Sequence, residues 1–312
     1  MFNPLIKKKK SRMATIYKQP RLAELSNIKE GYAESFDGTR IWYRCVGKGI
    51  PIIFCNGLGC STFFWKSVHS HFSKSHQSII FDWRGHGRSD KPKHSRNITM
   101  NAVTKDLHAV IKHLKLKKFI LAGHSMGVQV VLSYYHSFPC KILALLLCCG
   151  TFGNPMETFY NTQNSKHVFT LIYVFNHLFP KLANLIGYII SKNPFWFQMG
   201  SALKMMNPGL VDKQVIKEYI EHITSVDAIF LAKLAKSMQE YNAESVLKGI
   251  NIPTLIVAGE RDIFTPVWIS KKMHHLIPYS ELLIVKKASH VALIEQPALI
   301  NLRIEKFIYE RL

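Results

Sequence analysis

A single serine stands between two glycines in the segment Gly123-His124-Ser125-Met126-Gly127, directly after the apolar run 119–122. This Gly-x-Ser-x-Gly pattern is typical of a nucleophile elbow, in which the serine lies on a tight turn between a strand and a helix and its hydroxyl stands clear of the sheet. The glycines leave room for the crossing backbone because they carry no side chain. The pattern also occurs by chance in Gly-rich turns, so its meaning depends on partners elsewhere in the chain.

A serine hydroxyl needs a base that removes its proton during attack, and the base needs a carboxylate that orients it. His290 is the candidate base, because an imidazole accepts the proton and returns it to the leaving group. Two acids, Glu260 and Asp262, lie in the loop after the apolar run 254–258. Taken alone, His290 is equally compatible with a turn histidine, and Asp262 with a helix cap or a turn residue.

Elements that could position these residues alternate along the chain, since apolar runs are followed by helical periods. This order is typical of a mostly parallel sheet covered by helices on both faces. Asp37-Gly38 between the first two apolar runs predicts a hairpin. The predicted strands are 31–36, 39–46, 51–55, 78–81, 118–122, one from 142, 254–258 and 282–285. The predicted helices are 62–74, 101–114, one that ends near 137, 266–276 and a closing helix.

Four motifs follow predicted strands in an order shared by one family. They are Asn56-Gly57-Leu58-Gly59, the run 82–89, the elbow, and Gly259-Glu260-Arg261-Asp262 together with Ser289-His290. With these motifs the chain resembles the α/β-hydrolase superfamily from about Glu30 to Leu312. The resemblance implies an α/β fold with a mostly parallel eight-stranded sheet and helices on both faces. It also implies a catalytic triad in the chain order Ser, Asp, His.

The resemblance assigns roles to individual residues. It places the triad on Ser125, Asp262 and His290, because the family's acid falls deep in the loop where Asp262 lies. It places the donors of an oxyanion hole on the backbone amides of Leu58 and Met126. A serine nucleophile also separates this chain from the epoxide hydrolases and haloalkane dehalogenases of the same fold, which use an aspartate.

Two positions depart from the pattern of the family, and one motif is expected to have a structural role. Asn56 stands where family members often carry a histidine, so the support of the oxyanion loop differs from theirs. Val128 stands where many relatives have a second glycine, which predicts tighter packing beneath the elbow. The polar run that contains Asp82 and Arg84 is expected to hold neighbouring loops and not to take part in the chemistry.

The segment 151–241 is an insertion that should form a helical cap over the site, within a core formed by 30–150 and 242–312 and preceded by a basic arm, 1–29. The front of the insertion, 158–211, contains no acidic residue and many aromatic ones. Such a surface either lines an apolar pocket for an acyl chain or packs the cap helices on one another, and the sequence leaves both open. The aromatic residues are Phe159, Tyr160, Phe169, Tyr173, Phe175, Phe179, Tyr188, Phe195, Trp196 and Phe197.

The charge of this 312-residue chain is unusual, with a formal net value of +21 at pH 7. Such a field favours an anionic membrane surface or an acidic carrier protein as partner, although a generally basic surface is an equal alternative. No nucleic-acid module is recognisable, so no nucleic acid is expected. The segment 1–21 is lysine-rich but lacks the apolar core of a signal peptide, and no apolar stretch reaches the ~18 residues of a membrane span. A cytoplasmic protein with peripheral membrane contact through its arm is therefore expected.

Cysteine and histidine usage adds no metal or disulfide. The six cysteines contain no Cys-x-x-Cys pair, and most lie in or beside apolar runs. The histidines at 69, 71 and 76 are expected on a helix end and the loop after it. The sequence thus predicts a serine hydrolase that cleaves a hydrophobic carboxylic ester without metal or organic cofactor. A carbon-carbon bond hydrolase, a thioesterase, an acyltransferase and a non-catalytic ligand-binding member remain as alternatives.

Overall fold

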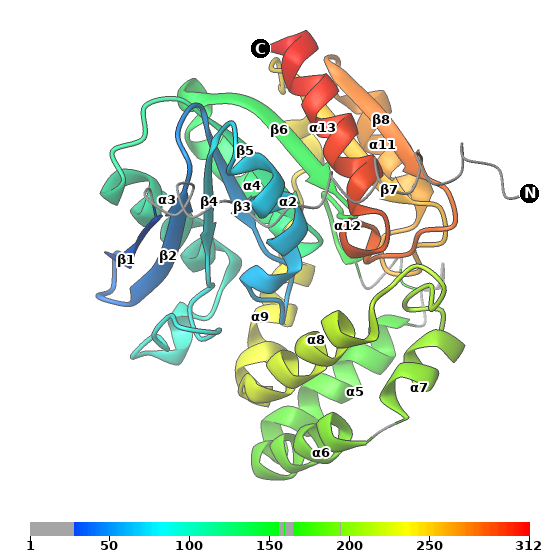
Figure 1. The fold of residues 1–312 in the computed structure, drawn as a ribbon. Coiled ribbons are helices and arrows are strands. Elements are labelled where there is room, and N and C mark those ends of the chain that lie inside the picture. The colour runs from blue at the N-terminus through cyan, green and yellow to red at the C-terminus, as the bar shows by residue number, and fades with distance from the viewer. Residues whose placement is uncertain (1–27, 156–158, 160–164, 194) are drawn as a thin grey trace, which may run out of the picture.

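A central sheet of eight strands, in the order β1-β2-β4-β3-β5-β6-β7-β8, organises the computed structural model (Figure 1), which describes residues 28–155, 159, 165–193 and 195–312. β2 pairs antiparallel with β1 and β4, and the other neighbouring strands pair in parallel. The predicted mostly parallel eight-stranded sheet is thus confirmed. The strands are β1 (Ile28–Glu34), β2 (Arg40–Val46), β3 (Pro51–Cys55), β4 (Gln77–Phe81), β5 (Phe119–His124), β6 (Ile142–Cys148), β7 (Thr254–Gly259) and β8 (Ser280–Val285).

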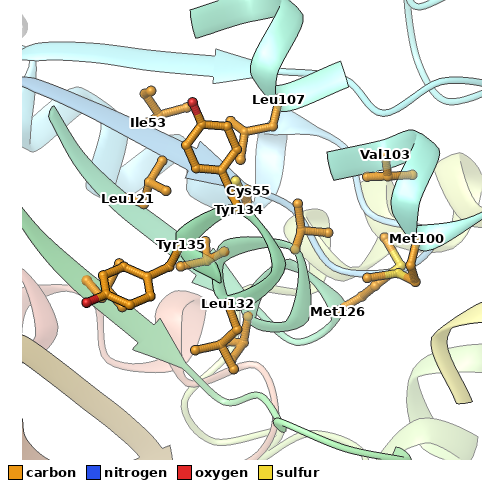
Figure 2. Packing of buried hydrophobic residues seen from close by; sticks show 14 of the residues in the cluster. Ile53, Cys55, Met100, Val103, Leu107, Leu121, Met126, Leu132, Tyr134 and Tyr135 are labelled. Carbon is orange, nitrogen blue, oxygen red and sulfur yellow. The ribbon is translucent and has the colours of Figure 1, made fainter. Parts of the chain in front are cut away.

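Helices cover both faces of the sheet, because successive side chains of each buried strand point to opposite sides. On β3, Ile53 packs with the cluster of α3, α4 and α11, whereas Ile52 packs with the cluster of α2, α12 and α13. These helices are α2 (Lys66–Phe72), α3 (Met100–His113), α4 (Met126–Ser137), α11 (Val267–Leu276), α12 (Ala292–Glu295) and α13 (Pro297–Arg311). Figure 2 shows the first cluster, in which Leu107 of α3 and Tyr134 of α4 lie beside Leu121 of β5.

In the described part of the predicted insertion, five helices follow β6 and precede β7. They are α5 (Ser165–Leu178), α6 (Pro180–Lys192), α7 (Trp196–Ala202), α8 (Lys213–Ser225) and α9 (Ala228–Glu240), and α10 (Glu244–Leu247) then leads back to β7. α5 packs on α9, and α6 packs on α8. In Figure 1 the helices α5 to α8 lie together below the sheet, on the side where the parallel strands end. Across the described ranges, no helix has both the length and the apolar character needed to cross a bilayer.

Most predicted elements differ from the structure by a few residues in their limits, and the helix predicted over 62–74 and the first strand show why. The helix predicted over 62–74 divides into a 3-10 turn, η2 (Thr62–Trp65), and the shorter α2. The carboxylate of Asp82 holds the start of the turn by accepting hydrogen bonds from the Ser61 hydroxyl and the Thr62 amide, at 3.1 and 3.4 Å. Ile28 already belongs to the first strand, three residues before the predicted start, since it is in register with Val46 of β2.

Arg84 ties its own loop to the β1–β2 turn, to the segment before α3 and to α3 itself, in the structural role that the sequence predicts. Its buried guanidinium donates to both carboxylate oxygens of Asp106 at 2.7 and 2.6 Å, to Asp37 at 2.9 Å, and to the Asn97 carbonyl at 2.9 Å. Burial raises the pKa of Asp37, but hydrogen bonds from Thr39 and Arg84 outweigh it and lower that pKa to about 2. Two charged pairs therefore fix the loop after β4 at the base of the site.

Candidate active site

Ser125 lies at the turn between β5 and α4 with φ 55° and ψ −120°, a backbone conformation that residues other than glycine rarely adopt. The glycines on either side make this turn possible. A Cβ at Gly123 would collide with the carbonyl of Gly127, and a Cβ at Gly127 would collide with the carbonyl of Cys55. The sequence therefore needs glycine at both positions to hold the serine in a nucleophile elbow.

The valine at position 128 is accommodated by a glycine from another strand connection. A Cβ on Gly150, just beyond β6, would collide with the Val128 side chain. The Val128 side chain therefore occupies the space that the absence of a side chain at Gly150 leaves open. The packing beneath the elbow is tight, as predicted, but it does not displace Ser125, whose amide donates to the Cys148 carbonyl at 3.1 Å.

The structure brings Ser125, His290 and Asp262 together in one hydrogen-bonded chain. The Ser125 Oγ lies 3.0 Å from His290 Nε2, and His290 Nδ1 lies 2.9 Å from Asp262 Oδ2. A carboxylate can only accept, so Nδ1 carries the proton and Nε2 is left to accept the serine proton. The three residues come from loops after β5, β7 and β8, which end at the same edge of the sheet.

The carboxylate of Asp262 is fixed on every side. Its Oδ1 accepts from the amides of Phe264 and Thr265 at 2.8 and 2.9 Å, and its Oδ2 accepts from the Thr265 hydroxyl at 2.8 Å as well as from His290. Its side chain is fully buried. The rival acid Glu260 points elsewhere, where it accepts from Lys286 Nζ at 2.9 Å and the Lys287 amide at 2.8 Å.

The loop after β3 carries Leu58 beside the elbow. Asn56 supports this loop differently from a histidine, because its side-chain amide donates to the Phe81 carbonyl at 2.8 Å and its own carbonyl accepts from the Trp83 indole at 3.1 Å. Among the hydrogen bonds between described residues, none is donated by the amides of Leu58 or Met126. Their assignment as oxyanion donors stays a prediction that this arrangement permits.

A pocket of about 480 Å³ opens onto Ser125 and His290. Its walls come from the oxyanion loop, from η2 and from the inserted helices, with Phe64, Phe169 and Tyr219 among the lining residues. None of the described residues that line it is an Asp, Glu, Lys or Arg. The serine therefore faces an uncharged, apolar space beneath the insertion.

The model of the alpha/beta hydrolase fold family matches residues 50–297, most of the chain. The protein belongs to the α/β-hydrolase fold family. The match includes the elbow, both loops that hold Asp262 and His290, and the whole insertion.

Relatives in this family are distant. The chain is 23% identical over 261 residues to protein ABHD8 of Bos taurus, which covers 83% of this chain and 56% of that protein, so the chain spans about half the length of ABHD8. It is 24% identical over 284 residues to the uncharacterized hydrolase YugF of Bacillus subtilis, covering 87% of this chain and 95% of YugF.

Among solved structures, a thermophilic esterase from Thermogutta terrifontis superimposes with a TM-score of 0.73 at 20% identity, over 90% of this chain and 98% of the esterase. The enol-lactonase from Burkholderia xenovorans LB400 superimposes with a TM-score of 0.71 at 19% identity, over 89% and 100%. At these identities the superpositions establish the fold, and the chemistry must be argued from the residues of this chain.

The aromatic residues of the insertion divide between several environments. Phe159 and Phe169 line the pocket, and Phe197 packs against the small cluster of Met206, Val211 and Ile216. Tyr160 and the side chain of Trp196 lie outside the described residues. Four further rings are exposed and do not line the pocket, although Phe175 and Phe179 contact each other with ring centroids 5.7 Å apart. The four exposed rings are Phe175, Phe179, Tyr188 and Phe195.

Much of the pocket wall was not predicted from sequence. It comes from the rear of the insertion, where α8 contributes Ile216, Ile220 and Ile223, and α9 contributes Leu231. Their helical spacing indicates an apolar face, but it does not indicate that this face meets a serine. Phe264, two residues beyond the acid, also lies against the His290 ring, with 4.9 Å between ring centroids.

His124 is a second residue that the sequence analysis missed. It is buried, its ring stacks on Phe64 with centroids 4.2 Å apart, and its Nε2 lies 3.0 Å from the carbonyl oxygen of His290. Because a carbonyl only accepts, Nε2 is the protonated nitrogen of a neutral ring. His124, the residue before Ser125, thus tethers the backbone of His290.

Replacing His124 by phenylalanine is expected to lower kcat for ester hydrolysis by roughly tenfold to a hundredfold, because it preserves the stacking but removes the tether on His290. Steady-state kinetics on a p-nitrophenyl ester would measure the change. His124→Gln, whose amide can donate to the same carbonyl, should recover part of the loss. An unchanged kcat in His124→Phe would show that the tether has no role.

The stability of the fold should depend on pH through two buried histidines. Burial lowers the pKa of His86 to about 4 and that of His124 to about 3. The unfolded chain, with histidine pKa values near ~6.5, binds more protons below that pH than the folded chain does. The free energy of unfolding should therefore fall by a few kcal/mol as the pH drops from about 6.5 to about 4, with no contribution from these two groups above that range.

Urea unfolding across this pH range would measure the effect. His86→Gln should reduce the slope of stability against pH, whereas the same change at the exposed His275 should leave it as in the wild type. Equal slopes for all three proteins would mean that other groups cause the acid sensitivity.

Glu295 joins the loop of the general base to the insertion. Its buried carboxylate accepts from the Ser289 amide at 2.6 Å and the Ser289 hydroxyl at 2.8 Å, next to His290. It also accepts from the amide of Asn207, which lies between α7 and α8, at 2.6 Å. The Asn207 side chain donates in turn to the Lys287 carbonyl at 2.9 Å. The Glu295 carboxylate therefore links the loop that carries His290 to the segment between α7 and α8.

Proposed function

We propose that the protein is a serine hydrolase that cleaves an uncharged carboxylic ester with a hydrophobic acyl group. The observation that carries the proposal is the Ser125, His290 and Asp262 chain, with both links at 3.0 Å or less, facing a pocket without charged side chains. A nucleophile, a base and an orienting acid are the groups that acyl transfer requires.

In the proposed reaction the Ser125 Oγ attacks the ester carbonyl carbon while His290 Nε2 takes the hydroxyl proton. The buried Asp262 stabilises the imidazolium, and the amides of Leu58 and Met126 donate to the oxygen that becomes negative. The C–O bond to the alcohol then breaks, and His290 returns its proton to the leaving oxygen. A water molecule then attacks the acyl carbon while His290 takes one of its protons. The bond between the acyl carbon and Ser125 Oγ breaks, and His290 returns the proton to Oγ as the carboxylic acid leaves.

The pocket decides between classes of acyl group. Burying an anion or a cation without a partner is costly, whereas burying a methylene is favourable, and the wall offers no charged partner among the described residues. Aliphatic and aromatic side chains form most of the wall, so longer acyl chains gain contact area. The proposed substrate is therefore a neutral ester whose acyl chain enters the space between α5, α8 and α9.

Hydrolysis of p-nitrophenyl esters of increasing acyl length would test the proposal. Each methylene that enters the pocket contributes about 0.8 kcal/mol, so kcat/KM should rise by up to about fourfold per added methylene until the pocket is filled. Ala235→Trp, which places a large ring in the wall formed by α9, should reduce the rate for long chains and leave the shortest ester nearly unaffected. A preference for acetate over all longer acyl groups would contradict the hydrophobic pocket.

The alternatives within this family give different results in the same assay. A meta-cleavage product hydrolase from Pseudomonas fluorescens IP01 also superimposes on this chain, with a TM-score of 0.66, so carbon-carbon bond cleavage needs its own substrate series. A thioesterase would prefer the matching thioesters, and an acyltransferase would transfer the acyl group to an added alcohol. A non-catalytic binding member would turn over none of them.

The proposal also includes contact of the basic arm with an anionic partner and a cytoplasmic location, both of which come from the sequence. Residues 1–27 lie outside the described residues, so contact of the arm with an anionic membrane or an acidic carrier protein rests on its lysines alone. A cytoplasmic location remains a prediction from the sequence.

A further inference from the structure

The first three helices of the insertion expose an unusual amount of apolar surface. Most of the large apolar side chains that are exposed in the described residues lie between 168 and 205. We call the following set the apolar face: Val168, Leu171, Phe175 and Leu178 on α5, Leu182, Leu185 and Ile189 on α6, and Phe195, Met199 and Leu203 on and beside α7. Leu171 is 70% exposed and Phe195 is 67% exposed. Exposed patches of this kind mark interaction surfaces in soluble proteins.

The apolar face follows one side of each helix. On α5 and then α6 its members recur at intervals of three and four residues, from Val168 to Ile189, which places them on a single side of each helix. Another side of each helix packs within the insertion, since α5 packs on α9 and α6 packs on α8. In Figure 1, α6 lies at the lower edge of the molecule, away from the sheet. On both helices, one apolar side packs against the other helices of the insertion, and a second apolar side is exposed.

The segment that carries the apolar face has charges of one sign. No acidic residue occurs between 158 and 211, whereas Lys181, Lys192 and Lys204 lie along α6 and after α7 and are exposed. A second copy of this chain would bring another basic face to this one, in a protein with a net charge of +21. An anionic lipid surface supplies the opposite charge, and each lysine near such a surface contributes about 1 kcal/mol.

The helices are too short to span a bilayer and suited to lie in its surface. α5 has 14 residues and α6 has 13, below the ~20 that a transmembrane helix needs. Amphipathic helices with large aliphatic and aromatic side chains and with lysines at the margin bury their apolar side in the boundary between headgroups and acyl chains. The apolar face has this composition.

The apolar face lies next to the pocket. Ile172 of α5 lines the pocket and is 47% exposed, and Met205 after α7 lines it as well and is 36% exposed. The wall of the pocket and the outer surface therefore share residues on α5 and beyond α7.

We propose that the apolar face docks the protein on an anionic bilayer, with the outward side of α5 and α6 in the headgroup boundary. Docking does not depend on the hydrolase activity, and it involves a surface separate from the basic arm. It places the side of the insertion that carries Ile172 toward the lipid.

Flotation of the full-length protein with phosphatidylcholine vesicles, with and without phosphatidylglycerol, would test the docking. The wild type should float with the vesicles that contain phosphatidylglycerol. Leu171→Asp/Leu185→Asp, two changes on the apolar face outside the pocket wall, should lower the partition coefficient by about tenfold or more. The matched control Leu299→Asp/Leu302→Asp changes two exposed leucines of α13 and should bind within about twofold of the wild type. Circular dichroism would verify that both variants are folded.

Three results would overturn the proposal. Failure of the wild type to bind either vesicle would remove it. Equal binding by the two double variants, abolished by high salt, would assign membrane contact to charged segments such as the arm. A wild-type dimer in light scattering that becomes monomeric only in Leu171→Asp/Leu185→Asp would make the apolar face a contact between copies of the chain.

Discussion

Replacing Ser125 by alanine is expected to lower kcat for the hydrolysis of a p-nitrophenyl ester by on the order of 10⁶-fold, because no other hydroxyl can accept the acyl group at the elbow. The oxyanion loop and the pocket remain, so the substrate should still bind and KM should change little. Labelling by a fluorophosphonate probe, which needs the activated serine, should disappear in the same variant. Mass spectrometry of the labelled wild type should locate the adduct on Ser125.

The general base provides the control for this prediction. His290→Ala should reduce kcat about as much as Ser125→Ala, and the double variant should be no slower than either single one, because the residues act as a unit. Activity that survives in Ser125→Ala, with the protein folded, would sink the proposed mechanism. Wild-type protein that is folded but neither labelled nor active would support the non-catalytic alternative.

Replacing Asp262 by asparagine should lower kcat by about 10⁴-fold while leaving the fold intact. The amide cannot stabilise the imidazolium. Its NH₂ group also favours the tautomer of His290 in which Nε2 carries the proton and cannot accept one from Ser125. The side chain would remain close to Thr265 and to the amides that now hold the carboxylate. Steady-state kinetics above pH 7 would measure the loss.

Glu260→Gln is the matched control for the acid. Glu260 lies two residues earlier in the same loop, but its partners are Lys286 and the Lys287 amide and not His290. We therefore expect its kcat to stay within about twofold of the wild type. Loss of activity in Glu260→Gln together with a nearly normal Asp262→Asn would reverse the assignment of the acid.

The sheet could be predicted because its signals are local. Buried parallel strands are short, continuous apolar runs, and those at 51–55 and 254–258 match β3 and β7 to within a residue. Limits that depend on distant partners were less accurate. β1 includes Ile28, which pairs with Val46 of β2, and η2 forms where Asp82 accepts hydrogen bonds from residues 61 and 62.

The insertion shows where sequence reasoning reaches its limit. A period of three and four residues indicates which side chains share one side of a helix, but it does not tell what lies against that side. The same apolar spacing therefore describes α8, which faces the pocket, and α5 and α6, which also face outward. Only the packing of α5 on α9 and of α6 on α8 separates the two cases.

The site was predictable to the extent that motifs carry it. Glycines with no room for a Cβ and an acid deep in its loop are visible in the sequence around Ser125 and Asp262. His124 and Glu295 were missed because their contacts join residues far apart in the chain, at His290 and at Asn207. A buried polar residue needs a hydrogen-bond partner, but the sequence does not show which distant residue supplies it.

The carboxylate of Glu295 makes the insertion and the general base parts of a single mechanical linkage. A chimera that exchanges 151–241 for the insertion of another family member would lose the amide of Asn207 and, with it, one of the restraints that hold Ser289 next to His290. In the proposed enzyme, a change in the insertion that alters the range of substrates should therefore also alter the catalytic rate. We expect a change in the insertion near Asn207 to move the loop that carries His290 as well.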